Sequence, residues 1–256
     1  MLSYSEKGSG QPLVLLHAFP LNRHMWDRQL EDWSNRYRVI APDFRGFGES
    51  DLGEDESRME SFADDVKDLL DSLKVAGKSI LLGLSMGGYV AFEFCRKYPE
   101  RLMAMIMIAT QPIADSEESR KSRYELAEMV RTRGTEVLSE QMTPRLLGKT
   151  TREIRPDVVE TVRRLIIKNS SRGVSKACYG LASRRDSTPI LETIRVPVLI
   201  VAGAEDPIIP ASQLEALKAG IRQSQLVVIP QSGHLVNLEQ PQELDRLVQV
   251  FLAGLG

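Results

Sequence analysis

The sequence predicts an α/β protein with a mostly parallel, open sheet, helices on both faces of that sheet, and an inserted helical cap. Three observations lead to this expectation. Short apolar runs recur along the chain, most are followed by a segment with helical periodicity, and one long central segment contains no strand-like run. Continuous apolar runs are typical of parallel strands covered on both faces. Alternating strands and helices are typical of a parallel sheet on which the helices pack.

Six apolar runs predict strands, and helical periodicity predicts five helices that alternate with them or follow them. The predicted strands are 12–18, 38–41, 79–84, 102–109, 198–202 and 225–229. The predicted helices of this part of the chain are 24–35, 58–74, 86–97, 211–219 and 240–253. Six strands are too few for a closed eight-stranded barrel, so we expect an open sheet.

The alternation breaks in the middle of the chain, where only helices are predicted, at 119–133, 155–169 and 175–183. We therefore expect a core formed by residues 1–111 and 186–256, with a helical cap over residues 112–185. The cap segment holds 16 Lys and Arg but 10 Asp and Glu, a net charge of +6 in a chain whose net charge is −2. This excess either draws an anionic substrate toward a site or belongs to solvated helix faces.

The composition is that of an ordinary folded protein, with 42% hydrophobic and 27% charged residues among 256. This length suits one large domain with or without an insertion. The charge lacks the basic excess of nucleic-acid binders, and Cys95 and Cys178 lack metal-ligand spacing and are expected to be reduced thiols. Because signal-peptide features and membrane-length apolar runs are missing, we expect a cytoplasmic protein without metal, cofactor, nucleic-acid or membrane partners.

The pattern Gly-x-Ser-x-Gly around Ser85 joins the strand 79–84 to the helix 86–97. In this strand–turn–helix context the pattern is typical of a nucleophile elbow. The glycines allow a sharp turn that presents the serine hydroxyl at a helix N-terminus, where developing negative charge is favoured. Ser85 is therefore the predicted nucleophile, and a purely structural Gly-Ser turn is the alternative.

Asp206 and His234 each follow a predicted strand, at the sheet edge where open α/β sheets place their sites. A serine hydroxyl needs a base to remove its proton, and a histidine base needs a carboxylate that orients it. The chain has three histidines, and His234 is the one that follows Ser85. Glu205 competes for the role of the acid, but the turn fixed by Pro207 favours Asp206.

Acyl transfer also needs two hydrogen-bond donors aimed at the oxyanion, each worth about 3–4 kcal/mol. The backbone N–H groups of Met86, directly after the nucleophile, and of Phe19, in the loop after the first predicted strand, are the candidates. His17 is expected to brace this loop and His24 to lie on a helix surface, so neither is assigned a catalytic role.

Five segments resemble, in the correct order, motifs of the α/β-hydrolase superfamily. They are HAFPLNRHMW at 17–26, APDFRGFGES at 41–50, GLSMGG at 83–88, GAEDPIIP at 203–210 and SGHLVNLEQP at 232–241. The resemblance covers nearly the whole chain and is strongest to small carboxylesterases and 3-oxoadipate enol-lactonases. It implies the order Ser, Asp, His for the catalytic residues and a structural role for the turn at 43–50. A haloalkane dehalogenase would carry Asp in place of Ser85.

Two features depart from the pattern of this superfamily. Ala18 replaces the usual glycine of the first motif, which could restrict the loop that carries Phe19. The chain also begins near the second strand of the family, so the first antiparallel edge strand of the sheet is expected to be missing. Neither departure involves the three predicted catalytic residues.

The combined features imply a serine esterase or lactonase, a monomer or homodimer, that cleaves a small-molecule ester or lactone through an acyl-enzyme. An enol-lactonase or a carbon–carbon bond hydrolase of aromatic degradation is one alternative. A non-enzymatic, ligand-sensing protein that keeps this fold is another. Five methionines either line an acyl pocket or fill the core, namely Met103, Met105, Met107, Met129 and Met142.

Overall fold

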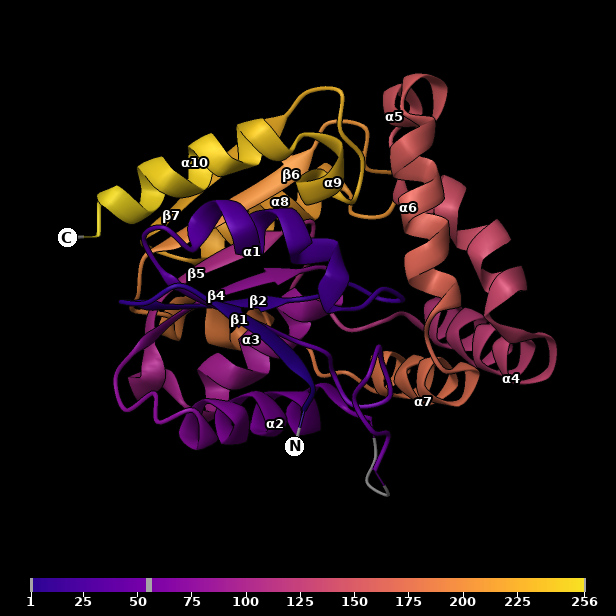
Figure 1. Ribbon diagram of the computed structural model, residues 1–256, viewed down its shortest axis with the longest axis horizontal. Coiled ribbons are helices and arrows are strands. Elements are labelled where there is room, and N and C mark those ends of the chain that lie inside the picture. The colour runs from indigo at the N-terminus through magenta and orange to yellow at the C-terminus, as the bar shows by residue number, and fades with distance from the viewer. Residues whose placement is uncertain (1, 54–56, 256) are drawn as a thin grey trace.

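The computed structural model describes residues 2–53 and 57–255 and contains one sheet with flanking helices (Figure 1). The strands are β1 (Tyr4–Lys7), β2 (Pro12–Leu16), β3 (Arg38–Pro42), β4 (Ser79–Leu84), β5 (Leu102–Ile108), β6 (Val198–Gly203) and β7 (Ser224–Ile229). Their order in the sheet is β1-β3-β2-β4-β5-β6-β7. β1 is antiparallel to β3 and the other pairs are parallel, which confirms the predicted fold class.

The six predicted strands are present, and β1 was not predicted. Its sequence, Tyr-Ser-Glu-Lys, has no apolar run, and most of its residues are exposed at the edge of the sheet. By contrast, every residue of the central strand β4 is buried, as its apolar sequence predicts. An antiparallel strand therefore closes this edge of the sheet, although the sequence led us to expect that the first edge strand was missing.

Helices cover both faces of the sheet, with α2 and α3 on one side and α1 and α10 on the other (Figure 1). The helices of this part are η1 (Arg23–Trp26), α1 (Asp27–Trp33), α2 (Met59–Ser72), α3 (Met86–Lys97), η2 (Pro99–Arg101), η3 (Thr188–Thr193), α8 (Ala211–Gly220), α9 (Val236–Glu239) and α10 (Pro241–Ala253). The prediction for α3 was correct at both ends. The short helix α9 was not predicted.

Four helices form an inserted region between β5 and β6, at the carboxyl edge of the sheet (Figure 1). They are α4 (Glu117–Leu146), α5 (Lys149–Ile154), α6 (Pro156–Ile167) and α7 (Ser171–Ala182). The sequence predicted the first half of α4, α6 and most of α7. It missed the second half of α4, which follows a kink at Gly134 and contains Pro144. Thr135 and Ser139 of this half donate to carbonyls of α6, and such tertiary contacts leave no local pattern in the sequence.

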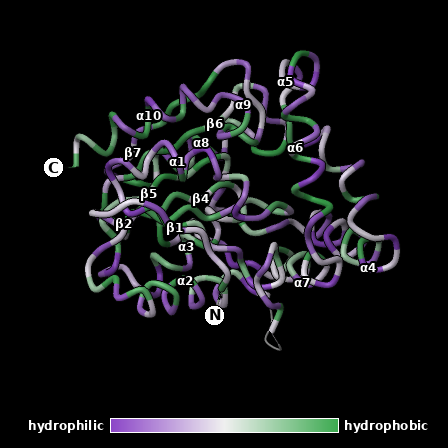
Figure 2. The backbone as a smooth tube through the Cα atoms, in the orientation of Figure 1, coloured by the Kyte–Doolittle hydropathy of each residue, from purple (hydrophilic) through white to green (hydrophobic). Residues whose placement is uncertain are grey.

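Hydrophobic residues concentrate along the strands of the sheet (Figure 2). Met105 and Met107 of β5 are fully buried there, and Met103 and Met129 pack against the same core. These four methionines therefore fill the core. No helix within residues 2–53 and 57–255 combines the length and the apolar character needed to cross a bilayer.

Candidate active site

Ser85 lies in the turn between β4 and α3 with φ 54° and ψ −110°. A positive φ is unfavourable for a residue with a side chain and occurs where surrounding structure enforces it. Here the Ser85 N–H donates to the carbonyl of Ile108 at 2.9 Å. A methyl group on Gly83 would collide with the backbone of Gly87, and one on Gly87 with the carbonyl of Leu16. The packing thus holds Ser85 at the N-terminus of α3.

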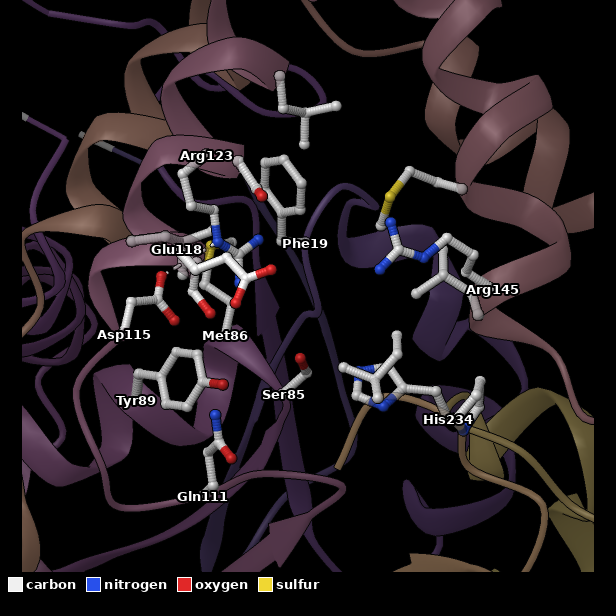
Figure 3. Close-up of a pocket in the computed structure, with 18 residues that line it drawn as sticks. Phe19, Ser85, Met86, Tyr89, Gln111, Asp115, Glu118, Arg123, Arg145 and His234 are labelled. Atoms are coloured by element: carbon white, nitrogen blue, oxygen red, sulfur yellow. Dashed lines mark hydrogen bonds and ion pairs between the residues drawn. The ribbon is translucent and has the colours of Figure 1, made fainter. Parts of the chain in front are cut away.

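His234 and Asp206 form a buried pair at the ends of β7 and β6. The distance between His234 Nδ1 and Asp206 Oδ2 is 2.8 Å, and the two side chains are 1% and 2% exposed. Asp206 Oδ1 accepts from the N–H of Ile208 at 2.8 Å. Because a carboxylate only accepts, His234 Nδ1 is the donor, and Nε2 is left as an acceptor. Figure 3 shows His234 and Ser85 on the wall of one pocket.

Glu205, the competing acid, has different partners. Its carboxylate accepts from the hydroxyl of Thr150 at 2.5 Å and from the N–H of Thr150 at 2.7 Å. These hydrogen bonds lower the pKa of Glu205. Of the two neighbouring carboxylates, Asp206 is therefore the one that bonds to His234, and Glu205 ties the β6 loop to the start of α5.

Phe19 and Met86, the predicted oxyanion donors, both line the pocket that contains Ser85 (Figure 3). Neither of their backbone N–H groups donates a hydrogen bond to another residue in the described part of the chain. Ala18, which replaces the glycine of the family, is buried, and its N–H donates to the sulfur of Met25 at 3.3 Å. The two amides are available as donors to a bound molecule.

His17 braces the loop that carries Phe19, as the sequence predicted. Its Nε2 accepts from the N–H of Phe44 at 3.0 Å, and Nδ1 lies 3.1 Å from the carbonyl of Ala18. Burial lowers the pKa of His17 to about 4, so the ring is neutral near pH 7. His24 lies at the surface, where its Nδ1 is 3.0 Å from a carboxylate oxygen of Asp27.

Asp43 begins the turn at 43–50 and is fully buried. Its carboxylate pairs with the guanidinium of Arg23 and accepts from the N–H groups of Arg23 at 2.7 Å and Glu49 at 3.0 Å. All of these contacts are internal to the core. Asp43 therefore holds the turn in place against the loop at 17–22, which agrees with the structural role expected for it.

The pocket is a cavity of about 380 Å³, in the usual size range of sites for small molecules. The core contributes Phe19, Ser85, Met86, Tyr89, Pro207, Ile208 and His234 to its walls. The inserted region contributes residues of α4, including Glu118, Ser119, Ser122, Arg123, Leu126, Met142, Arg145 and Leu146. Met142 is thus the one of the five considered methionines that lines the cavity.

The charged side chains of the pocket differ in their partners. Asp115 lies 3.3 Å from Arg123 Nε and 2.5 Å from Arg184, and it is buried. Arg145 and Glu118 are exposed and have no ion-pair partner among the described residues. Figure 3 shows Arg145 on the side of His234, with Glu118 on the opposite wall. These two charges are therefore free to act on a bound molecule.

Cys95 and Cys178 are buried free thiols away from the cavity, and burial raises their pKa values to about 11 and about 12. Thiols with such pKa values remain protonated near neutral pH, where they are poor nucleophiles. Within residues 2–53 and 57–255, no group of three His, Cys, Asp or Glu side chains is arranged to hold a metal ion.

Comparison with known proteins agrees with this architecture. A model of the alpha/beta hydrolase fold family matches residues 11–241. The 3-oxoadipate enol-lactonase 2 of Acinetobacter baylyi is 28% identical over 253 residues, which are 98% of this chain and 92% of that protein. A thermophilic esterase from Thermogutta terrifontis, solved with malate bound, superposes with a TM-score of 0.96 and 42% identity over 99% of this chain and 93% of that one. An enol-lactonase from Burkholderia xenovorans superposes with a TM-score of 0.90 and 26% identity over 98% and 96% of the two chains. These matches confirm the resemblance seen in the motifs, and the chain belongs to the α/β-hydrolase fold family.

Proposed function

We propose that this protein is a serine hydrolase that cleaves carboxylic esters or lactones with small acyl groups, with Ser85 as nucleophile, His234 as base and Asp206 as acid. The observation that carries the proposal is that His234, bonded to the buried Asp206, lines the same cavity as Ser85. The similarity to an esterase and to enol-lactonases supports the same class of substrate.

The reaction follows from the hydrogen-bonding roles of the three side chains. His234 Nε2 takes the proton of Ser85 as Oγ attacks the carbonyl carbon, and Asp206 stabilises the imidazolium through Nδ1. The N–H groups of Phe19 and Met86 bind the oxyanion of the tetrahedral intermediate. His234 then protonates the leaving alcohol, and an acyl-enzyme remains on Ser85. Water, activated by the same histidine, attacks this ester and releases the acid.

In this proposal residues 112–185 act as a cap, or lid, over a core formed by 1–111 and 186–256. Helix α4 supports this role because it provides much of the cavity wall that faces Ser85. A substrate would therefore contact both parts, with the chemistry supplied by the core and the shape of the acyl site by the cap.

An enol lactone of aromatic degradation is a second candidate substrate, since the similar proteins include enol-lactonases. The same three residues serve both reactions. A panel of p-nitrophenyl acetate, p-nitrophenyl butyrate, an enol lactone and a dienone for carbon–carbon cleavage would separate these activities. Thermal stabilisation by one of these compounds without multiple turnovers would instead indicate a ligand-sensing protein.

The decisive experiment replaces the nucleophile. We expect Ser85→Ala to lower kcat on p-nitrophenyl butyrate by at least about 10⁴-fold, because loss of a catalytic serine removes the covalent route. Ser122→Ala is the matched control, since this serine also lines the cavity but lies on α4, and it should keep kcat within about threefold. Intact-mass analysis should find a fluorophosphonate adduct on the control and none on Ser85→Ala. Full activity of Ser85→Ala would refute the proposal.

A further inference from the structure

Asn169 lies between α6 and α7, and its buried side chain joins the inserted region to two loops of the core. Its Nδ2 donates to the carbonyl of Pro20 at 2.8 Å, and its Oδ1 accepts from the N–H of Gly48 at 2.8 Å. Nδ2 also donates to the carbonyl of Leu165, in its own helical region, at 2.8 Å. Asn169 is 5% exposed.

The partners of Asn169 fix the orientation of its amide. A backbone N–H only donates and a carbonyl only accepts, so the oxygen must face Gly48 and the nitrogen must face Pro20. Asn22 completes the network, because its Nδ2 lies 3.2 Å from the carbonyl of Leu165 and 3.3 Å from Asn169 Oδ1. With its donors and acceptors all used, this buried network is rigid and sensitive to the loss of one member.

Asn169 and His17 hold the loop of Phe19 from its two sides. On the N-terminal side of Phe19, His17 Nε2 accepts from the N–H of Phe44 at 3.0 Å. On its C-terminal side, Asn169 donates to the carbonyl of Pro20. His17 and Asn169 both contact the turn at 43–50, through Phe44 and Gly48. The inserted region thus contacts the loop one residue after Phe19.

We propose that Asn169 is a positioning residue for the oxyanion donor Phe19, so that the inserted region sets the rate of the chemical step as well as covering the cavity. This inference rests on the proposed function, because it requires the Phe19 amide to bind the oxyanion. Displacement of a catalytic group by about 1 Å costs about 10²-fold in rate, and loss of one oxyanion donor costs about 10²–10³-fold. The loop keeps its other hydrogen bonds, including that of the Leu21 N–H to the carbonyl of Ala18 at 2.9 Å, so the loss should fall toward the lower end of this range.

Two variants of Asn169 and one control test the proposal. Asn169→Ala removes every bond of the side chain, whereas Asn169→Asp keeps the size and the acceptor for Gly48 but cannot donate to Pro20. Thr135→Val is the control, because the Thr135 hydroxyl donates to the carbonyl of Ile167 at 3.1 Å and so ties the same end of α6 without contacting the loop. Values of kcat are expressed per serine that reacts to completion with a fluorophosphonate, so partial unfolding of a variant does not lower them.

We expect both Asn169 variants to lower kcat on p-nitrophenyl butyrate by about 10- to 100-fold, with KM changed by less than about threefold. Affinity for a boronic acid that forms a tetrahedral adduct should fall by a similar factor. The control should lose thermal stability but keep its kcat and its boronate affinity. Asn169 variants that keep kcat, or lose no more of it than Thr135→Val, would overturn the inference. Activity that survives Ser85→Ala would instead overturn the proposed function itself.

Discussion

His17 is a titratable residue that the fold keeps uncharged beside the candidate active site. Its ring packs against Phe44 and Phe47, with ring centroids 4.5 Å and 5.1 Å away. A protonated ring could not accept the bond from the Phe44 N–H, and its charge would be costly in this fully buried position. The position of the loop at 17–22 therefore depends on a neutral histidine.

This burial predicts how stability depends on pH. The unfolded chain binds a proton on His17 near pH 6.5, whereas the folded protein binds it near pH 4. Because the unfolded state binds more protons between these values, the stabilisation is complete above about pH 6.5 and is lost as the pH falls toward about 4, by up to about 3 kcal/mol. We expect His17→Gln to show a smaller loss of unfolding free energy between pH 7 and pH 4.5, measured by urea titration. The matched control is His24→Gln at the surface, and equal losses in the two variants would contradict the prediction.

The site residues differ in how far the sequence could predict them. Ser85 has a local pattern, and His234 could be selected because the chain has so few histidines. The preference for Asp206 over Glu205 was weaker, because it rested only on side-chain length and on the turn fixed by Pro207. Asn169 had no signal at all, since its partners Pro20 and Gly48 are more than a hundred residues away along the chain.

The loop of His234 meets the end of α4 at close range. The N–H of His234 donates to the carbonyl of Leu146 at 3.2 Å, and the N–H of Gly148 donates to the buried carboxylate of Glu239 at 2.8 Å. A methyl group on Gly233 would collide with the backbone of Gly148. The position of His234, the proposed base, is thus set by this contact with the end of α4 as well as by the bond to Asp206.

This contact predicts the effect of a single methyl group. We expect Gly233→Ala to lower kcat/KM on p-nitrophenyl butyrate by about 10- to 100-fold, because the loop must move and carry His234 with it. Gly77→Ala is the matched control, since a methyl group at that position meets no atom within 4 Å. If the two variants have the same kcat/KM, the contact does not position the histidine.

Helices and strands could be predicted where their own residues carry the pattern that stabilises them. The buried strands and amphipathic core helices have clear apolar patterns, whereas β1 is polar because one edge of the sheet faces solvent. The second half of α4 follows a kink at Gly134, contains Pro144 and is hydrogen-bonded to α6. What the sequence could not predict is therefore stabilised mainly by tertiary contacts.

At the scale of the whole molecule, positive charge is concentrated in the inserted region. Residues 112–185 have a net charge of +6, whereas the whole chain has −2. Most of these side chains face solvent, but Arg145 lies at the cavity without a carboxylate partner among the described residues, opposite Glu118. The excess is either a property of solvated helices or a means of attracting anionic substrates, and Arg145 allows the two to be distinguished.

This is tested by comparing KM for two esters whose acyl chains have equal length, one charged and one neutral. If Arg145 binds anionic substrates, Arg145→Gln should raise KM for p-nitrophenyl hemisuccinate by about 3- to 10-fold, since an exposed charge contact contributes about 1 kcal/mol. KM for p-nitrophenyl butyrate should stay unchanged, because that chain carries no charge. Glu118→Gln, the control on the opposite wall, should leave KM for the hemisuccinate equal or lower. The effect of Arg145→Gln should also shrink as salt is raised well above about 0.1 M, where the Debye length is about 10 Å. Equal changes in KM for both esters would mean that Arg145 shapes the pocket without recognising the charge of the substrate. The positive charge of the inserted helices would then be a property of solvated helix faces alone.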